Sequence, residues 1–237
     1  MNEPHKAVLD AATQPFRRAG IAAWHHARGK LRFDPVYFNL LQHGLLPNDG
    51  TLLDLGCGRG FLLALIVAAC RQYRSGHWPS GWRAPPQRLR LEGLERQGDL
   101  VAVARTALRD DARIEQQDIR VAEFPACDVV ILLDVLLYLE EQEQHRVLER
   151  AVRALNPGGV VLLREADAGA GAAFQATKWS EHFLEVARGR CRPRLHYRTA
   201  REWIQLLEDL DTVVRAEPMS SGTPFSNVLF VATRYPG

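Results

Sequence analysis

The residues best suited to chemistry in this sequence stand in the stretch LLDLGCGRGFLL. One acid, Asp54, comes two residues before the first of three glycines, Gly56, Gly58 and Gly60. Glycine backbone lets a bulky ligand approach closely, because it carries no side chain. A carboxylate beside such a turn would repel a phosphate and attract a cation, directly or through water. The stretch therefore predicts a ligand site that favours a cationic group.

Two phosphate-binding motifs do not fit this loop. A dinucleotide fingerprint needs a third small residue that packs the next helix closely to the strand, and Phe61 stands at that place. The later acid of that fingerprint is missing, and the loop also lacks the GK[ST] of a P-loop. A ligand with an ammonium group, a sulfonium centre, a ribose and an adenine fits better.

Short apolar runs alternate with amphipathic stretches after residue 50, which is typical of βαβ units on a parallel sheet. The predicted strands are 51–56, 89–95, 113–117, 127–134 and 160–165, with helices at 60–72, 98–109 and 141–155. Two terminal strands, TVVRAEP and NVLFVATR, are joined by a short loop and should pair antiparallel. We expect an α/β, Rossmann-like fold: a seven-stranded, mostly parallel sheet with one antiparallel edge strand, helices on both faces, and a helical N-terminal cap.

Composition and length indicate one globular domain. The chain has 237 residues, 46% of them hydrophobic and 24% charged, and a net charge of +2, too small to argue for a nucleic-acid partner. The four cysteines form no metal-ligand cluster, and no apolar run is long enough to span a bilayer. The N-terminus lacks the apolar region of a signal peptide, so we expect a cytoplasmic protein without a metal.

One segment, SGHWPSGWRAPPQR at 75–88, interrupts the alternating pattern. Its prolines, glycines and two tryptophans indicate a loop insertion. It is either a solvated excursion or a rim piece in which Trp78 and Trp82 cover an apolar surface.

The stretch DLGCGRG resembles the first motif of class I S-adenosylmethionine-dependent methyltransferases. Four further pieces follow in the family's order: LEGLER, QQDIR, DVVILLDVLLYL and LNPGGVVLL. The resemblance implies S-adenosylmethionine as the cofactor, S-adenosylhomocysteine as the product, and a single methyltransferase domain. Its parts would be a cap at 1–48, a cofactor-binding core at 49–165, a substrate lid at 166–200, and a last helix and hairpin at 201–237.

The resemblance also implies which residues bind the cofactor. Glu95 matches the acid that binds the ribose hydroxyls, and Asp118 with Ile119 matches the pair beside the adenine. Asp134 ends the fourth strand and faces the methyl group; the alternative is that it caps the next helix. For Asp118 the alternative is an ordinary N-cap. The cofactor-binding set is Asp54, Gly56, Cys57, Gly58, Gly60, Glu95, Arg96, Asp118, Ile119 and Asp134.

The methyl acceptor is marked less clearly. The stretch after the fourth strand has no [DN]PP[YF] motif of adenine-N6 enzymes, and the sequence has no Pro-Cys dipeptide of cytosine-C5 enzymes. The stretch after the fourth strand looks more like the small-molecule branch of the family. In that branch, histidine is common at the position that Tyr138 occupies here. The candidate catalytic residues are Asp134, Tyr138, His182 and His196. The candidate acceptor-binding residues are Trp24, Tyr37, Phe38, Trp179 and Tyr197, although surface or packing roles are the alternative for histidines and aromatics alike.

The stretch FRRAGIAAWHHARGKLRFDPVYF is similar to methyltransferases of bacterial aryl-polyene pigment clusters. That resemblance implies O-methylation of an aromatic hydroxyl, with the acceptor presented by an acidic acyl carrier protein. The facing basic residues would be Arg17, Arg18, Arg28, Lys30 and Arg32, and the alternative is a solvated basic face. N-methylation, RNA methylation, and a non-catalytic subunit of a biosynthetic complex remain open alternatives.

Overall fold

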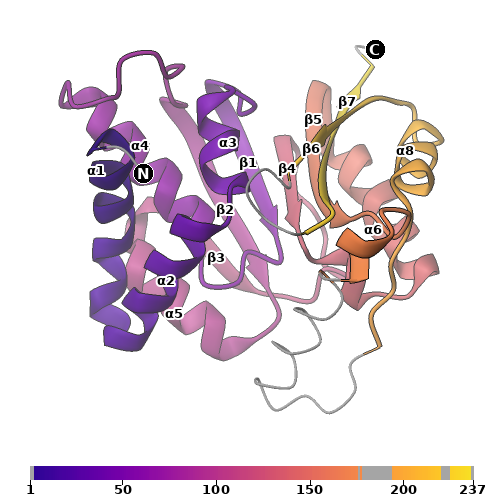
Figure 1. Ribbon diagram of the computed structural model, residues 1–237, viewed down its shortest axis with the longest axis horizontal. Helices are drawn as coiled ribbons and strands as arrows, with labels where there is room; N and C mark the ends of the chain where they lie inside the picture. Colours follow the sequence, from indigo (N-terminus) through magenta and orange to yellow (C-terminus); the bar gives the residue numbers. More distant parts are fainter. Residues whose placement is uncertain (1–2, 176, 178–193, 220–224, 236–237) are drawn as a thin grey trace. The chain divides into compact units, whose positions relative to one another are not determined.

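The structure is a computed structural model that describes residues 3–175, 177, 194–219 and 225–235 (Figure 1). The chain divides into two compact units. The first contains the residues up to 123 together with 127–129, and the second contains 124–126 and 130–237. The division falls inside strand β4 (Cys127–Leu133), so each unit is described by itself.

The first unit begins with the predicted helical cap. It consists of α1 (Glu3–Thr13), the 3-10 helix η1 (Gln14–Ala19), α2 (Ile21–Phe33) and α3 (Val36–Gln42). The buried face of α2 is made by Ala23, Ala27 and Leu31, which are four residues apart and therefore share one side of the helix. Small residues on that face allow a close approach to the elements beneath it.

The rest of the first unit is a parallel sheet with its connecting helices. The strands are β1 (Asp49–Leu55), β2 (Arg88–Glu95) and β3 (Arg113–Gln116), and the helices are α4 (Phe61–Arg74), α5 (Gly98–Leu108) and the short η2 (Arg109–Asp111). β1 pairs parallel with β2, and β2 pairs parallel with β3. Because parallel strands end at one edge of a sheet, Asp54 and Glu95 come to neighbouring strand ends.

The insertion at 75–88 is a loop up to residue 87, as predicted, and its tryptophans are packed. The Trp78 and Trp82 rings lie edge to face with their centroids 5.3 Å apart. Trp82 also contacts His5 of α1, at 4.5 Å, and Phe38 of α3, at 5.9 Å. These ring contacts attach the insertion to the helical cap.

The second unit combines an antiparallel strand arrangement with helices. Its elements after β4 are η3 (Leu136–Tyr138), α6 (Glu141–Ala154), β5 (Leu155–Ala166), α8 (Ala200–Glu208), β6 (Thr212–Pro218) and β7 (Asn227–Arg234). β7 pairs antiparallel with both β5 and β6, which confirms the predicted terminal hairpin. β5 starts five residues before the predicted strand, because the segment NPGG already belongs to it.

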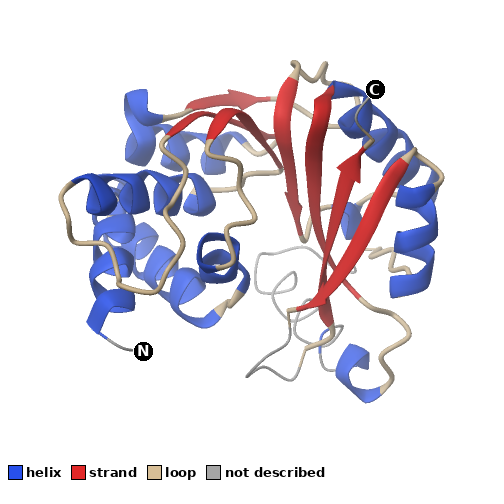
Figure 2. Ribbon diagram, turned by 90° about the horizontal axis from the view of Figure 1, so that it is seen from above, coloured by secondary structure: helices blue, strands red, loops and turns tan. Residues whose placement is uncertain are grey.

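The strand order is β3-β2-β1-β4-β5-β7-β6. The expected Rossmann-like α/β fold with a seven-stranded, mostly parallel sheet is confirmed. The reversed strand is β7, which lies next to the outermost strand β6 and not at the edge itself. Figure 2 shows the strands in red and the helices in blue. Among the described helices, none has the length and hydropathy needed to cross a bilayer. Within the predicted lid at 166–200, residues 176 and 178–193 lie outside the described residues.

Candidate active site

All three glycines of the loop between β1 and α4 have positive φ angles. The values are 74° at Gly56, 55° at Gly58 and 76° at Gly60, in the left-handed region that glycine adopts without strain. Gly60 also lies against α5, since a Cβ there would come within 2.7 Å of Leu108 Cδ1. The backbone conformation thus requires a glycine at every second position, and the close helix approach falls at Gly60 rather than at Phe61.

The end of β2 holds this loop in place. The N–H groups of Gly56 and Cys57 both donate to the carbonyl of Leu94, at 2.8 and 3.0 Å. The side chain of Glu95 is 7% exposed, and its Oε2 accepts a hydrogen bond from the N–H of Gly58 at 3.1 Å. Its Oε1 accepts from the N–H of Gln97 at 2.7 Å. Glu95 is therefore an oriented, buried carboxylate at the glycine loop and not a solvated charge.

Asp54 is the other buried carboxylate at this edge, and it is 4% exposed. Within the part of the chain that the structure describes, no group donates a hydrogen bond to its carboxylate or pairs with it. Burial, and next the nearby charge of Glu95, raise the pKa of Asp54 to about 7. A cation beside the carboxylate would stabilise its charged form, so the site fits a ligand with a positive group.

The turn after β3 carries the remaining predicted cofactor-binding residues of the first unit, apart from Arg96 after β2. The N–H of Gln117 donates to the carbonyl of Glu95 at 3.0 Å, which ties this turn to the end of β2. The carboxylate of Asp118 accepts from Arg120 Nε and Nη2, at 3.0 and 2.6 Å, and these bonds lower its pKa. Asp118 opens a turn and not a helix, Ile119 is 7% exposed, and Arg96 is exposed.

In the second unit, Asp134 follows β4 with a positive φ of 57°. Both of its carboxylate oxygens accept from the guanidinium of Arg164, with a distance of 2.9 Å from Nε to Oδ1. The side chain of Arg164 is 1% exposed, so its end of this ion pair is buried. Oε1 of the neighbouring Glu165 accepts from the N–H groups of Val135 and Leu136, at 3.2 and 2.7 Å. Asp134 therefore belongs to an ion pair with β5, and α6 begins only at Glu141.

Two predicted catalytic residues, Tyr138 and His196, lie on segments that contact each other. The N–H of His196 donates to the carbonyl of Leu137 at 2.8 Å. Gln144 of α6 is fully buried, and its Nε2 donates to the carbonyls of Leu136 and His196, at 3.0 and 3.1 Å. Tyr138 is 41% exposed beside this junction.

The sequence analysis missed Gln144, although its place on α6 could have indicated it. Gln144 shares the buried face of the helix with Val147, Leu148 and Ala151, at the three- and four-residue spacing of an apolar stripe. A polar side chain within such a stripe must find hydrogen-bond partners inside the protein. Nε2 also donates to the carbonyl of Leu139 at 3.2 Å, and Oε1 accepts from Arg198 Nε at 2.7 Å.

The candidate acceptor-binding aromatics have different surroundings. Tyr37 and Phe38 are 7% and 8% exposed, and Phe38 packs against Trp82 of the insertion, which favours the packing role for Phe38. The Trp24 ring is covered by the guanidinium of Arg17, whose Cζ is 4.2 Å from the ring centroid. Tyr197 lies edge to face with Phe174 at 5.0 Å. Trp179 and His182 lie outside the described residues.

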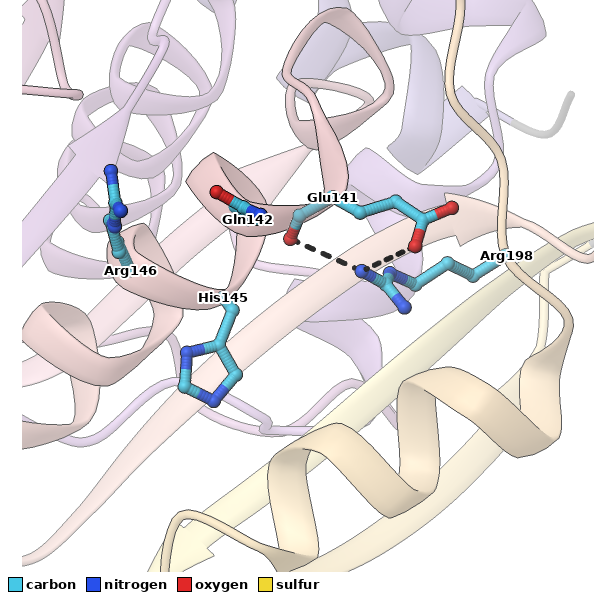
Figure 3. A pocket seen from close by; sticks show the side chains of 5 residues that line it. All are labelled: Glu141, Gln142, His145, Arg146 and Arg198. Carbon is cyan, nitrogen blue, oxygen red and sulfur yellow. Dashed lines mark hydrogen bonds and ion pairs between the residues drawn. The ribbon is translucent and has the colours of Figure 1, made fainter.

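A surface hollow of about 400 Å³ lies at the first turns of α6 (Figure 3). Its lining residues are Glu141, Gln142, His145, Arg146 and Arg198. Nη2 of Arg198 donates to the carbonyl of Glu141 at 3.2 Å and lies 3.7 Å from its Oε2. The hollow contains none of the predicted cofactor or acceptor residues.

The fold and the matching family profile identify the chain as a class I S-adenosylmethionine-dependent methyltransferase, as the first motif predicted. The chain belongs to the methyltransferase domain family, whose profile matches residues 23–217.

Among curated proteins, the chain is similar over part of its length to carboxy-S-adenosyl-L-methionine synthases. The chain is 30% identical over 117 residues to the carboxy-S-adenosyl-L-methionine synthase of Chromohalobacter salexigens, a match that covers 47% of this chain and 38% of that protein. The match to the synthase of Psychrobacter arcticus is 30% identical and covers 48% and 40%. The chain thus spans less than half the length of these curated relatives.

Solved structures match over nearly the whole chain. The pyocyanin biosynthetic protein PhzM is 19% identical with a TM-score of 0.64, and the match covers 93% of this chain and 61% of that protein. CalO1, a methyltransferase in calicheamicin biosynthesis solved with S-adenosylhomocysteine, is 22% identical with a TM-score of 0.60, over 91% and 58%. At these identities the likeness establishes the fold.

Proposed function

We propose that the protein transfers a methyl group from S-adenosylmethionine to an oxygen of a small aromatic or polyketide-like acceptor. The observation that carries this proposal is Asp54, a buried carboxylate beside a glycine turn that accepts no hydrogen bond from any described residue. Such a group favours a ligand with a positive charge and no phosphate. Asp54 would bind the ammonium end of the cofactor, Glu95 the ribose hydroxyls, and Asp118 with Ile119 the adenine.

The reaction is an in-line displacement in which the acceptor oxygen forms a bond to the methyl carbon as the carbon–sulfur bond breaks. Much of the rate enhancement in such a reaction comes from holding the two reactants in line. The hydroxyl proton must go to a base, and His196 is our candidate because hydrogen bonds of its backbone fix its segment. Tyr138 would line the acceptor site on the same side as His196. The carboxylate of Asp134 is already paired with Arg164, and its role would be to orient the loop after β4.

Support for a small acceptor comes from structural neighbours that include the mitomycin 7-O-methyltransferase MmcR, with a TM-score of 0.61. Presentation of the acceptor by an acidic carrier protein stays part of the proposal. Arg17 and Arg18 are exposed on η1 and are the residues best placed for such a partner. Arg28 and Lys30 already pair with acids of the cap itself.

Binding and turnover test the proposal in two steps. Calorimetry should find S-adenosylhomocysteine bound in the micromolar range, and Asp54→Asn should weaken binding at least about tenfold. Asp49→Asn is the matched control, since it makes the same change at the exposed other end of β1. Mass spectrometry of phenols incubated with protein and cofactor should then show a gain of one methyl group. No binding at millimolar ligand would contradict the proposal.

The curated relatives favour a second candidate function, the synthesis of a carboxylated cofactor. Mass spectrometry of the nucleoside after incubation with candidate carboxyl donors would separate the two, because the cofactor itself would gain mass. RNA methylation predicts binding to bulk tRNA that weakens steeply with salt. A non-catalytic subunit predicts cofactor binding without transfer to any acceptor.

A further inference from the structure

Cys57 of the glycine loop occupies the space directly above Gly93 of β2. A Cβ added at Gly93 would lie 2.8 Å from the Sγ of Cys57 and 3.1 Å from its Cβ. The first distance is shorter than real side chains show, and the second is tighter than most contacts between side chains. We propose that Cys57 and Gly93 form a size-matched pair that positions the glycine loop for the cofactor, and that Gly93 is a positioning residue of the cofactor site. The proposal rests on the proposed function.

A glycine is needed at position 93 because a side chain would not fit there, and not because of the backbone conformation. Its φ is not positive, unlike those of the three loop glycines, so alanine could adopt the same extended backbone. Its register partners are Asp54 in β1 and Ile114 in β3. A Cβ at Gly93 would also lie 3.0 Å from Cδ1 of Ile114, so the methyl group would be enclosed on two sides.

The pair lies beside the hydrogen bonds that attach the glycine loop to β2. Cys57 precedes Gly58, whose N–H donates to Glu95, and Gly93 precedes Leu94, whose carbonyl accepts from Gly56 and Cys57. A methyl group on Gly93 would push Cys57 away from β2 and lengthen these bonds together. The orientation of Glu95 toward the ligand would change with them.

Cysteine has the properties that this position requires. Its side chain is 9% exposed, and burial, followed by the charges of Asp54 and Glu95, raises the pKa of the thiol well above its usual value. The thiol therefore stays neutral beside two carboxylates. It fills the space above a glycine without adding a third charge to the site.

The test compares the affinity of three variants for S-adenosylhomocysteine by calorimetry. Gly93→Ala should bind at least about tenfold more weakly than the natural protein. It should still fold, with a lower midpoint of thermal unfolding, because the added methyl group overpacks a buried site. Gly29→Ala is the matched control, because Gly29 has no atom within 4 Å of an added Cβ and no positive φ. Its affinity should be unchanged. The double variant Cys57→Ala/Gly93→Ala removes the sulfur and should recover most of the lost affinity.

Natural affinity in Gly93→Ala would overturn the proposal, and so would a folded double variant that recovers nothing. If Gly93→Ala does not fold, Cys57→Leu enlarges the pair from the loop side and should weaken binding in the same way; unchanged affinity there would also overturn it. Failure of the natural protein to bind the ligand would instead contradict the proposed function.

Discussion

At the scale of single residues, Asp54 and Glu95 show how two buried carboxylates of one site can differ. Glu95 accepts hydrogen bonds from two backbone N–H groups, whereas Asp54 has no donor among the described residues. An ionised group without donors is unfavourable in a buried position, and its pKa rises for that reason. A positive ligand should therefore stabilise the ionised form of Asp54 more than that of Glu95.

The raised pKa of Asp54 predicts how stability and binding depend on pH. Between the usual pKa of 3.8 and the raised value of about 7, the folded protein holds a proton that the unfolded chain releases. The contribution of Asp54 to the free energy of unfolding therefore falls as pH rises through this window, by up to about 4 kcal/mol. Ligand affinity should rise over the same window, because the ammonium group favours the ionised carboxylate.

Urea denaturation at about pH 5 and about pH 8 measures this effect, with Asp54→Asn as the comparison. The variant cannot titrate at this position, so its stability should decrease less between the two pH values. Calorimetry in buffers of different ionisation heat should show proton release when S-adenosylhomocysteine binds at about pH 6. Equal pH dependence in both proteins would contradict the assignment of the titration to Asp54.

A second residue-scale prediction concerns the ion pair between Asp134 and Arg164. Asp134→Asn keeps a residue that tolerates positive φ, but it removes the carboxylate charge that pairs with the buried guanidinium of Arg164. We expect a loss of about 3 kcal/mol in the free energy of unfolding. Glu149→Gln is the control, because it breaks a largely exposed pair with Arg153 and should cost less than about 1 kcal/mol. Equal losses in the two variants would show that the Arg164 pair is no stronger than a surface pair.

At the scale of elements, α6 acts through Gln144 on the segment that carries His196. Gln144→Leu keeps the side chain buried but removes the amide group that donates to the carbonyls of Leu136, Leu139 and His196. We expect the free energy of unfolding to fall by about 2–4 kcal/mol, and hydrogen exchange at the N–H of His196 to become faster. Gln142→Leu makes the same change on the exposed side of α6 and should alter neither quantity. Unchanged exchange at His196 would show that Gln144 does not hold the segment.

The kinds and order of the elements could be predicted from the sequence, because each has a clear local pattern. β6 and β7 match the predicted strands residue for residue, and α8 begins at a capping box formed by Thr199 and Glu202. The start of β5 could not be predicted. Pro157 and Gly158 resemble a helix stop and a turn locally, but strand formation depends on partners distant in sequence.

In the candidate site, too, some features could be predicted from the sequence and others could not. The order of the strands predicts that Asp54 and Glu95 end neighbouring strands, because each acid closes an apolar run. Nothing local predicts that Arg164 binds Asp134, thirty residues away, because that pairing depends on tertiary structure. The Cys57 and Gly93 pair was hidden for the same reason.

At the scale of the whole molecule, the predicted roles follow the two units. All of the predicted cofactor residues except Asp134 belong to the first unit. The described catalytic candidates, Asp134, Tyr138 and His196, belong to the second. Affinity for the cofactor should therefore depend mainly on substitutions in the first unit, as the variants of Asp54 and Gly93 are designed to test.

The position of β7 has a consequence for how the protein is made. β7 pairs with β5 on one side and β6 on the other, although it is synthesised after both. The ribosome therefore releases the residues of the first unit well before the second can complete its strands, and domains generally fold as units during synthesis. Until β7 emerges, β5 and β6 each present an unpaired edge to other chains. A released chain that ends before Asn227 should recruit chaperones more strongly than one that includes β7.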